Sequence, residues 1–104
     1  MKDGEFEWDD AKASSNYAKH GVTFDAARDV FKDPFALEQI DDRHDYGEER
    51  WIILGAARDR LLLVAYTMRS DRIRIISARA AEPYEQREYH EQNARDDQAR
   101  LEPP

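Results

Sequence analysis

The feature that most constrains the fold of this chain is an almost wholly apolar run from Leu61 to Met68, set between two short polar turns. A run of this length and composition is typical of a central strand that is covered on both faces. The turns at 56–60 and 69–71 are too short for a crossover connection, so the flanking segments 49–55 and 72–78 must pair with it antiparallel. The centre of the chain therefore predicts an antiparallel meander.

The first third of the chain predicts helices instead. Residues 6–8 form a short strand or extended lead-in; Asp9 or Asp10 then caps a helix to about Lys19, which Gly21 ends. Thr23 caps a second helix over 24–32, whose apolar residues recur at helical spacing. A short strand over 35–40 precedes the meander, and a last helix starts at 82–83.

These elements predict an α+β fold in the order β-α-α-β-β-β-β-α, with the helices packed on one face of an antiparallel meander sheet. In the strand over 72–78, strict alternation would place Arg72, Arg74 and Ile76 on one face and Ile73, Ile75 and Ser77 on the other. The 104 residues suffice for one domain, expected over 1–90. Residues 91–104 are an almost wholly polar extension, either the end of the last helix or disordered.

The charge of the chain is unevenly distributed. The net charge is −7, yet residues 50–79 carry seven arginines and only two acidic residues. Arginine suits bidentate contacts to phosphate, so this basic centre fits an RNA-binding face, although a solvated sheet face would also explain it. The absence of cysteine excludes disulfides and thiolate metal sites, and no apolar stretch is long enough to span a membrane. We expect a cytoplasmic protein without a cofactor or a metal.

Three histidines are candidates for chemistry. His20 follows Lys19 at the end of the first predicted helix, where the two could face a phosphate, or where the helix dipole alone could favour a cation. His44 lies in an acidic loop whose spacing fits no familiar metal-binding pattern. His90 lies on the polar side of the last helix and is expected to be solvated.

Arginines and tyrosines complete the candidate site. Arg50, Arg69 and Arg79 lie at strand ends or turns, where functional groups are common, and Arg72 and Arg74 could form a phosphate-binding stripe. Pairing with acidic neighbours across strands is the alternative for all five. Tyr66 and Tyr89 could stack on a base, or pack in the core.

Several strings resemble the BrnT family of toxins over about residues 6–89. They are Phe6-Glu7-Trp8-Asp9, Lys12, Asn16, Lys19-His20-Gly21-Val22, Phe24, Ala27, Phe31, Asp33-Pro34, Glu49-Arg50, Gly55, Thr67-Met68-Arg69, Arg74-Ile75-Ile76-Ser77-Ala78-Arg79, Glu85, Arg87 and Tyr89. The resemblance implies a RelE-like fold and a ribonuclease of a type II toxin–antitoxin system, which inhibits translation. It also implies neutralisation by a BrnA-type antitoxin, through which alone the complex would bind operator DNA.

On this interpretation RNA is the substrate and cleavage is metal-independent. His20 would be the acid/base group, Lys19, Arg50, Arg69 and Arg79 would stabilise the phosphate, and Arg72, Arg74, Tyr66 and Tyr89 would bind RNA. The overall acidity is unusual for a protein that acts on RNA. A non-catalytic binding module, or a decayed toxin that only binds its antitoxin, is the alternative. A DNA-binding regulator acting alone fits less well, because the last helix is rich in glutamate.

Overall fold

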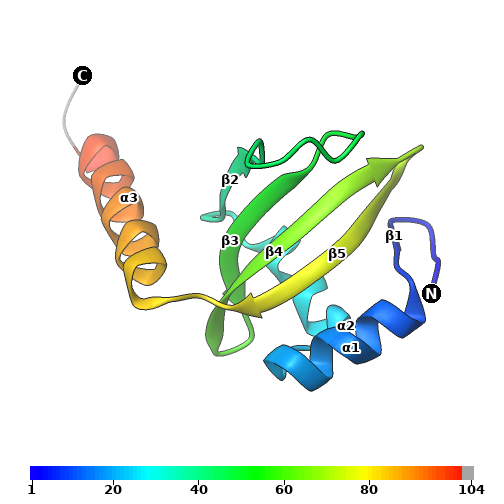
Figure 1. Ribbon diagram of the computed structural model, residues 1–104. Helices are drawn as coiled ribbons and strands as arrows, with labels where there is room; N and C mark the ends of the chain where they lie inside the picture. Colours follow the sequence, from blue (N-terminus) through cyan, green and yellow to red (C-terminus); the bar gives the residue numbers. More distant parts are fainter. Residues whose placement is uncertain (102–104) are drawn as a thin grey trace.

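The computed structural model describes the backbone of residues 1–101 and the side chains of residues 1–94. The fold is α+β, as the sequence predicts, with three helices and a five-stranded sheet (Figure 1). The elements in chain order are β1 (Phe6–Glu7), α1 (Asp10–His20), α2 (Phe24–Ala27), the 3₁₀ helix η1 (Arg28–Lys32), β2 (Leu37–Ile40), β3 (Trp51–Ala57), β4 (Arg60–Arg69), β5 (Arg72–Ala80) and α3 (Pro83–Leu101).

The sheet has the strand order β1-β5-β4-β3-β2. Strands β3, β4 and β5 pair antiparallel, as the short turns predict, and β2 also pairs antiparallel with β3. However, β1 pairs parallel to β5, with Phe6 opposite Ile73, so the sheet is mixed and the prediction of a purely antiparallel sheet is wrong. A parallel pair needs a long connection, and α1 to β4 supply it between β1 and β5.

The helix ends lie where the capping residues place them. The Asp9 side chain accepts a hydrogen bond from the N–H of Lys12 at the start of α1, and Gly21 ends the helix at φ 67°. Thr23 caps α2 in the same way through the N–H of Ala26. The single helix predicted over 24–32 is in fact α2 followed by η1, which tightens the last turns before Asp33 becomes extended ahead of Pro34.

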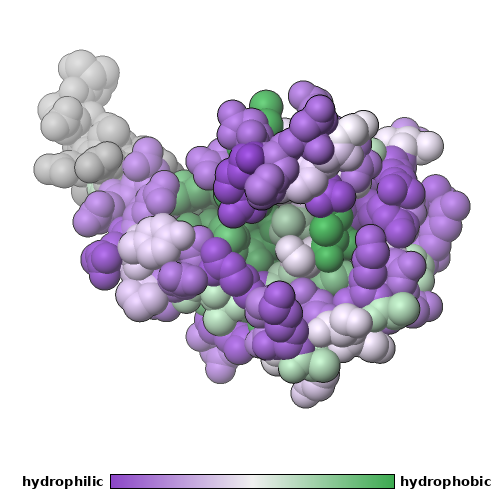
Figure 2. Space-filling model, viewed as in Figure 1, coloured by the Kyte–Doolittle hydropathy of each residue, from purple (hydrophilic) through white to green (hydrophobic). Residues whose placement is uncertain are grey.

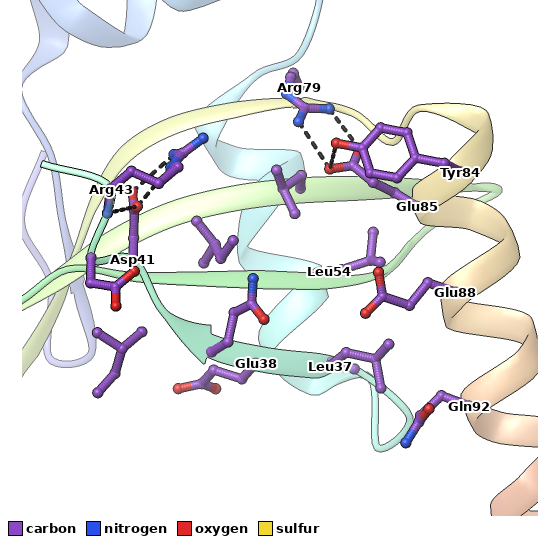
Figure 3. Close-up of a pocket in the computed structure, with 16 residues that line it drawn as sticks. Leu37, Glu38, Asp41, Arg43, Leu54, Arg79, Tyr84, Glu85, Glu88 and Gln92 are labelled. Atoms are coloured by element: carbon purple, nitrogen blue, oxygen red, sulfur yellow. Dashed lines mark hydrogen bonds and ion pairs between the residues drawn. The ribbon is translucent and has the colours of Figure 1, made fainter.

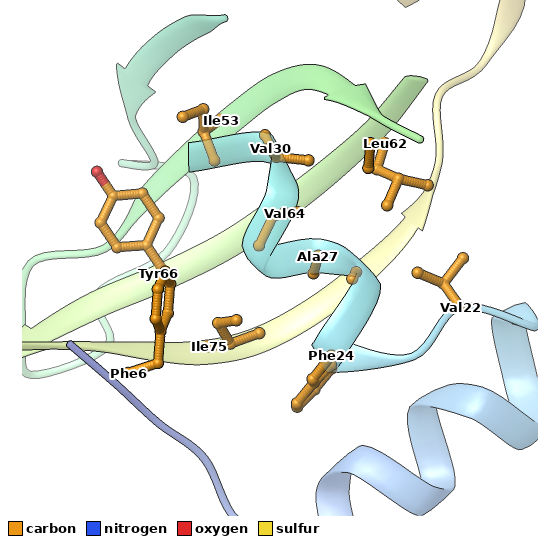
Figure 4. Packing of buried hydrophobic residues seen from close by; sticks show 12 residues of the cluster. Phe6, Val22, Phe24, Ala27, Val30, Ile53, Leu62, Val64, Tyr66 and Ile75 are labelled. Atoms are coloured by element: carbon orange, nitrogen blue, oxygen red, sulfur yellow. The ribbon is translucent and has the colours of Figure 1, made fainter. Parts of the chain in front are cut away.

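The main core lies between the sheet and the layer formed by α1, α2 and η1 (Figure 4). Val22, Phe24 and Val30 pack against Leu62 and Ile75 of the central strands. The largest side chains with almost no exposure are Phe24, Leu62, Ile75, Val22, Val30 and Val64. The layer therefore covers one face of the sheet, and we call the opposite face the open face.

The last helix departs from the prediction that all helices pack on one face. Tyr89 of α3 and Ala81 just before the helix pack with Leu54, and Leu61 and Leu63 of the same sheet face complete this small cluster. Because these side chains are on the open face, α3 lies against that side and projects beyond the sheet (Figure 1). The helix continues past residue 90 to Leu101, and residues 102–104 of the predicted extension lie outside the described residues.

A register shift in β5 changes which side chains reach the open face. Ser77 lies opposite Ala65 and Ile75 lies opposite Tyr66, so Ile76 is an extra residue in the strand. Strict alternation is therefore wrong from Ile76 onward: Ser77 does not share the face of Ile75. Ala78, buried in the core, takes the helix-covered side.

Candidate functional site

Five arginines project from the open face or its margin. Arg50 comes directly before Trp51, whose ring packs on the core, so Arg50 points to the opposite side. The others lie on β4 and β5: Arg69 opposite Arg72, Arg74 opposite Thr67, and Arg79 opposite Leu63. The structure thus gathers the five arginines that the sequence singled out on one face: Arg50, Arg69, Arg72, Arg74 and Arg79.

Four of these arginines have a carboxylate partner. Arg74 Nη1 lies 2.8 Å from Glu7 Oε2 on the neighbouring β1. Glu48 lies between Arg50 and Arg69, near the start of β3 and the end of β4. Its Oε1 is 3.4 Å from Arg50 Nε, and its Oε2 is 3.9 Å from Arg69 Nη2. Cross-strand and local pairing, the alternative considered from the sequence, therefore describes the resting state of these side chains.

Arg79 makes the most complete pair. Its Nη1 and Nη2 lie 2.7 and 3.0 Å from the two carboxylate oxygens of Glu85 at the start of α3. Glu85 also accepts the N–H of Glu82, as a residue three positions into a helix commonly does. Burial raises the pKa of Glu85, but the hydrogen bonds from Arg79 and Glu82 outweigh it and hold the pKa below its usual value.

Arg72 and Arg50 are held by other groups. Arg72 Nε donates to the backbone oxygen of Asp3 at 2.6 Å, which ties the hairpin to the N-terminal segment. The guanidinium of Arg50 lies 4.1 Å from the centre of the Tyr46 ring, within range of a cation–π contact. Both side chains are partly exposed, so each could exchange its present contact for a phosphate oxygen.

The Lys19 and His20 side chains lie apart from these arginines. They end α1, which follows the edge of β5 through Asn16: its amide bonds to both the N–H and the C=O of Ala78. Among the residues whose side chains are described, neither Lys19 nor His20 has a hydrogen-bond or ion-pair partner. The structure therefore leaves both groups free at the border of the sheet.

The two candidate tyrosines are core residues in this structure. Tyr66 is only 6% exposed, is stacked on Trp51, and donates to Glu38; burial and that hydrogen bond raise its pKa. Tyr89 is 9% exposed and donates to Asp33 Oδ2 at 2.7 Å; burial and this hydrogen bond raise its pKa to about 12. Base stacking by either ring would require it to leave these contacts, so core packing is the use that the structure supports.

The remaining histidines are on the surface. His44 lies edge-on to Tyr46 in the acidic loop, and His90 lies edge-on to Tyr89. In the region with described side chains, no three His, Asp or Glu residues converge as metal ligands would.

A cleft of about 610 Å³ separates α3 from β2 and the open face (Figure 3). Its floor is apolar, with Leu37, Leu54 and Leu63 side by side across three strands; the same face shows a hydrophobic hollow inside a polar rim (Figure 2). Its walls carry the Arg79–Glu85 pair on one side and an Asp41–Arg43 pair on the other. The sequence predicts only an acidic loop around His44 at this place.

Among the carboxylates of this cleft, Asp41 has the most strongly lowered pKa. Arg43 Nε and Nη2 lie 2.7 and 2.9 Å from its two oxygens, and Tyr46 donates to it at 3.1 Å. The hydrogen bonds from Arg43 lower the pKa of Asp41 to about 2, against an opposing effect of burial. No spacing in the sequence predicts this cluster, because it depends on the turn that brings Arg43 and Tyr46 back over Asp41.

The fold and the arginine face can be compared with known families. A family described as "Ribonuclease toxin, BrnT, of type II toxin-antitoxin system" matches residues 8–85. The chain belongs to the BrnT family. The match begins at Trp8 and ends at Glu85, so it includes all five arginines of the open face and the carboxylate that pairs with Arg79. A comparison with curated proteins found no match.

Membership of this family establishes the class of protein. The BrnT family consists of ribonuclease toxins of type II systems, which implies a protein antitoxin as partner. Over the residues that the structure describes, no helix is both long and apolar enough to cross a membrane.

Proposed function

We propose that this BrnT-family chain is an active endoribonuclease that binds RNA across the open face. The observation that carries the proposal is the convergence of Arg50, Arg69, Arg72, Arg74 and Arg79 on one face of three adjoining strands. Guanidinium groups arranged in this way can contact several phosphates of one strand, or stabilise the charge that develops on one of them. Each would exchange a carboxylate or backbone oxygen for a phosphate oxygen.

The proposed reaction needs no metal. The ribose 2′-hydroxyl attacks the adjacent phosphorus, the bond to the 5′-oxygen breaks, and the products carry a 2′,3′-cyclic phosphate and a 5′-hydroxyl. One group must take the 2′-hydroxyl proton and another must supply a proton to the leaving oxygen. The arginines would stabilise the phosphorane between these steps.

We assign the acid/base role to His20, with Lys19 beside it as a phosphate contact. Asn16 and His20 are one helical turn apart and share a face of α1, so the contact of Asn16 with Ala78 directs His20 towards the end of β5. Arg79 follows Ala78 in β5 and points to the open face, so RNA would reach both His20 and Arg79 around this edge of the sheet. His20 is also partly exposed and has no partner among the described side chains, as a group that exchanges protons with a substrate requires.

The biological role follows from the reaction. Cleavage of cellular RNA would inhibit translation, and a BrnA-type antitoxin would neutralise the toxin; operator DNA would be bound only through that antitoxin. The overall charge of −7 supports a limited RNA-contacting area at the arginines rather than a broad basic surface.

Expression in a bacterial host tests this proposal. We expect induced wild-type protein to arrest growth and translation, measured as incorporation of a labelled amino acid. We expect Arg69→Gln to relieve the arrest, because it removes an exposed guanidinium from the open face with little effect on folding. The matched control is Arg58→Gln, which removes a similarly exposed guanidinium from the β3–β4 turn, where it pairs with Asp25 and Asp29.

A second candidate function is favoured by the resting ion pairs. If the carboxylates hold these arginines too firmly for RNA to displace them, the chain binds its antitoxin but cleaves nothing. The absence of arrest with soluble wild-type protein present would support this non-catalytic module and contradict the ribonuclease. Arrest by wild type that His20→Ala leaves intact would remove only the acid/base assignment.

A further inference from the structure

We propose that the cleft between α3 and the sheet binds an extended segment of a protein partner that carries lysine or arginine side chains together with apolar ones. The inference concerns only this cleft, and holds whether or not the arginines of the open face cleave RNA. Three features of the cleft lead to it: its floor, its charge and its border.

The floor of the cleft offers apolar area to a partner. Leu37, Leu54 and Leu63 lie in one row across β2, β3 and β4, next to Ile52. Leu54 is already buried against Tyr89, so the half-buried Leu37, Leu63 and Ile52 supply the accessible area. At the rim, Ile40 is 55% exposed on β2 and Tyr84 is 55% exposed on α3. When a partner's apolar groups replace the water in this cleft of about 610 Å³, these side chains lose contact with water, which favours binding.

The charge of the cleft selects a cationic partner. Its lining includes five acidic residues, Glu38, Asp41, Asp42, Glu85 and Glu88, against two arginines, Arg43 and Arg79. The carboxylate of Glu38 is bonded to Tyr66 on the helix-covered side. Both guanidiniums are already paired, with Asp41 and Glu85 respectively. Two of the carboxylates, those of Asp42 and Glu88, have no partner among the side chains that the structure describes.

These unpaired carboxylates lie on opposite walls. Glu88 extends from α3 into the cleft (Figure 3). Asp42, also a lining residue, follows the end of β2 on the side away from α3. A segment lying between them would place a cationic group near each wall and apolar groups on the floor. RNA would be repelled from the same place, so a nucleic acid is the wrong class of ligand for this end of the face.

The border of the cleft suits an extended chain. Strand β2 is at the edge of the sheet, paired on one side with β3, and within the described residues no other strand joins it. An edge strand offers free backbone N–H and C=O groups, to which an extended partner can bind. In an extended segment alternate side chains point to opposite sides. A segment of alternating apolar and cationic residues would therefore place its apolar side chains on the floor and its cations near the acidic walls.

The test uses the whole protein and a short, fluorescently labelled peptide of alternating lysine and leucine, with fluorescence anisotropy as the readout. The double variant Asp42→Asn/Glu88→Gln should weaken binding about tenfold, because two charges that face the cleft are lost. The matched control Glu5→Gln/Asp59→Asn removes two exposed carboxylates elsewhere and should change the affinity less than about twofold. A peptide with glutamate in place of lysine should not bind.

The apolar contribution is tested separately. Ile40→Ser should weaken peptide binding several-fold, whereas Tyr17→Ser, which alters a similarly exposed apolar residue on α1, should not. Equal losses in the cleft and control variants would show general attraction between opposite charges and overturn the proposal. Binding that needs the peptide's lysines but shifts backbone NMR signals only outside β2 and α3 would overturn it as well. RNA cleavage is assayed without peptide, so the two proposals can fail independently.

Discussion

At the scale of single residues, Asp33 joins three parts of the molecule. Its carboxylate accepts the N–H of Ala56 at 2.8 Å, the hydroxyl of Tyr89 at 2.7 Å and the N–H of Phe35 at 2.9 Å. It thereby provides an acceptor for the N–H of Ala56 in a part of β3 that β2 does not reach. Through Tyr89 it also anchors α3 to the sheet. Burial raises the pKa of Asp33, but these three donors outweigh it and hold the pKa below the usual value.

We expect Asp33→Ala to lower the free energy of unfolding by about 2–3 kcal/mol, because it leaves partly buried donors without an acceptor. Tyr89→Phe removes only one of the three hydrogen bonds and should lower it by about 1 kcal/mol. Urea unfolding followed by circular dichroism measures both. Equal effects of the two substitutions would contradict the role of Asp33 in holding the edge of β3.

The pKa of Asp41 predicts a dependence of stability on pH. Because Arg43 lowers this pKa from 3.8 to about 2 in the folded state, the Asp41 carboxylate stabilises the protein fully above pH 4. That contribution is lost as the pH falls from about 4 towards about 2. We expect Asp41→Asn to be about 1 kcal/mol less stable than wild type at pH 7, and the difference to shrink at pH 2.

The same titration of Asp42→Asn provides the control, since Asp42 is exposed and has no partner among the described side chains. Its stability should follow that of wild type at each pH. A deficit of Asp41→Asn that is the same at pH 2 as at pH 7 would contradict the assignment of the lowered pKa to this contact.

The individual site residues were predictable by type, but their contacts were not. The arginines stood out because seven occur in 30 residues of an acidic chain, and the structure places five of them on one face. The carboxylates that hold them come from other elements: Glu7 of β1 holds Arg74, and Glu85 of α3 holds Arg79. Such pairs depend on the tertiary fold, so no spacing within a single strand reveals them.

At the scale of elements, the edge of β5 is divided between β1 and α1. The parallel pairing of β1 covers Ile73 and Arg74, and Asn16 of α1 then binds the backbone of Ala78. Asn16 also donates to the C=O of Val22 at 3.0 Å, which fixes the turn after the helix. One buried amide thus replaces a neighbouring strand at this position.

We expect Asn16→Ala to lower the free energy of unfolding by about 2–3 kcal/mol, because the N–H and C=O of Ala78 and the C=O of Val22 lose their buried partner. The matched control is Ser15→Ala, an exposed position on the same helix, which should change stability by less than about 0.5 kcal/mol. Hydrogen exchange of the Ala78 amide should accelerate in Asn16→Ala only; unchanged exchange there would contradict this account.

Most elements were predictable, because the capping residues and the short turns act locally. Besides the position of α3 and the division of the second helix, two features of the sheet were not. The parallel position of β1 is decided by contacts of Phe6 with the core rather than by its own two-residue strand. The sequence of β5 looks like ordinary alternation, yet the extra residue at Ile76 places Arg79 on the same face as Arg72 and Arg74.

At the scale of the whole molecule, charge divides the open face into two ends. Arg50, Arg69, Arg72 and Arg74 lie towards one end, while five acidic residues line the cleft between β2 and α3. The two regions meet beside Arg50, whose backbone oxygen accepts the N–H of Asp41. Arg79, paired with Glu85, stands at the boundary. The acidic residues of the cleft are thus distinct from Glu7 and Glu48, the carboxylates that RNA would have to displace from Arg50, Arg69 and Arg74.

The most direct test of the central claim is RNA cleavage by purified protein. We predict that wild type cleaves RNA in the presence of EDTA and leaves 5′-hydroxyl ends, and that Arg50→Gln/Arg69→Gln reduces the rate by at least about tenfold. The double variant Arg58→Gln/Arg87→Gln, with the same loss of charge at exposed sites outside the arginine end, should cleave like wild type. No cleavage by folded wild-type protein, or equal rates in both double variants, would contradict the claim that this chain is a ribonuclease acting through its open-face arginines.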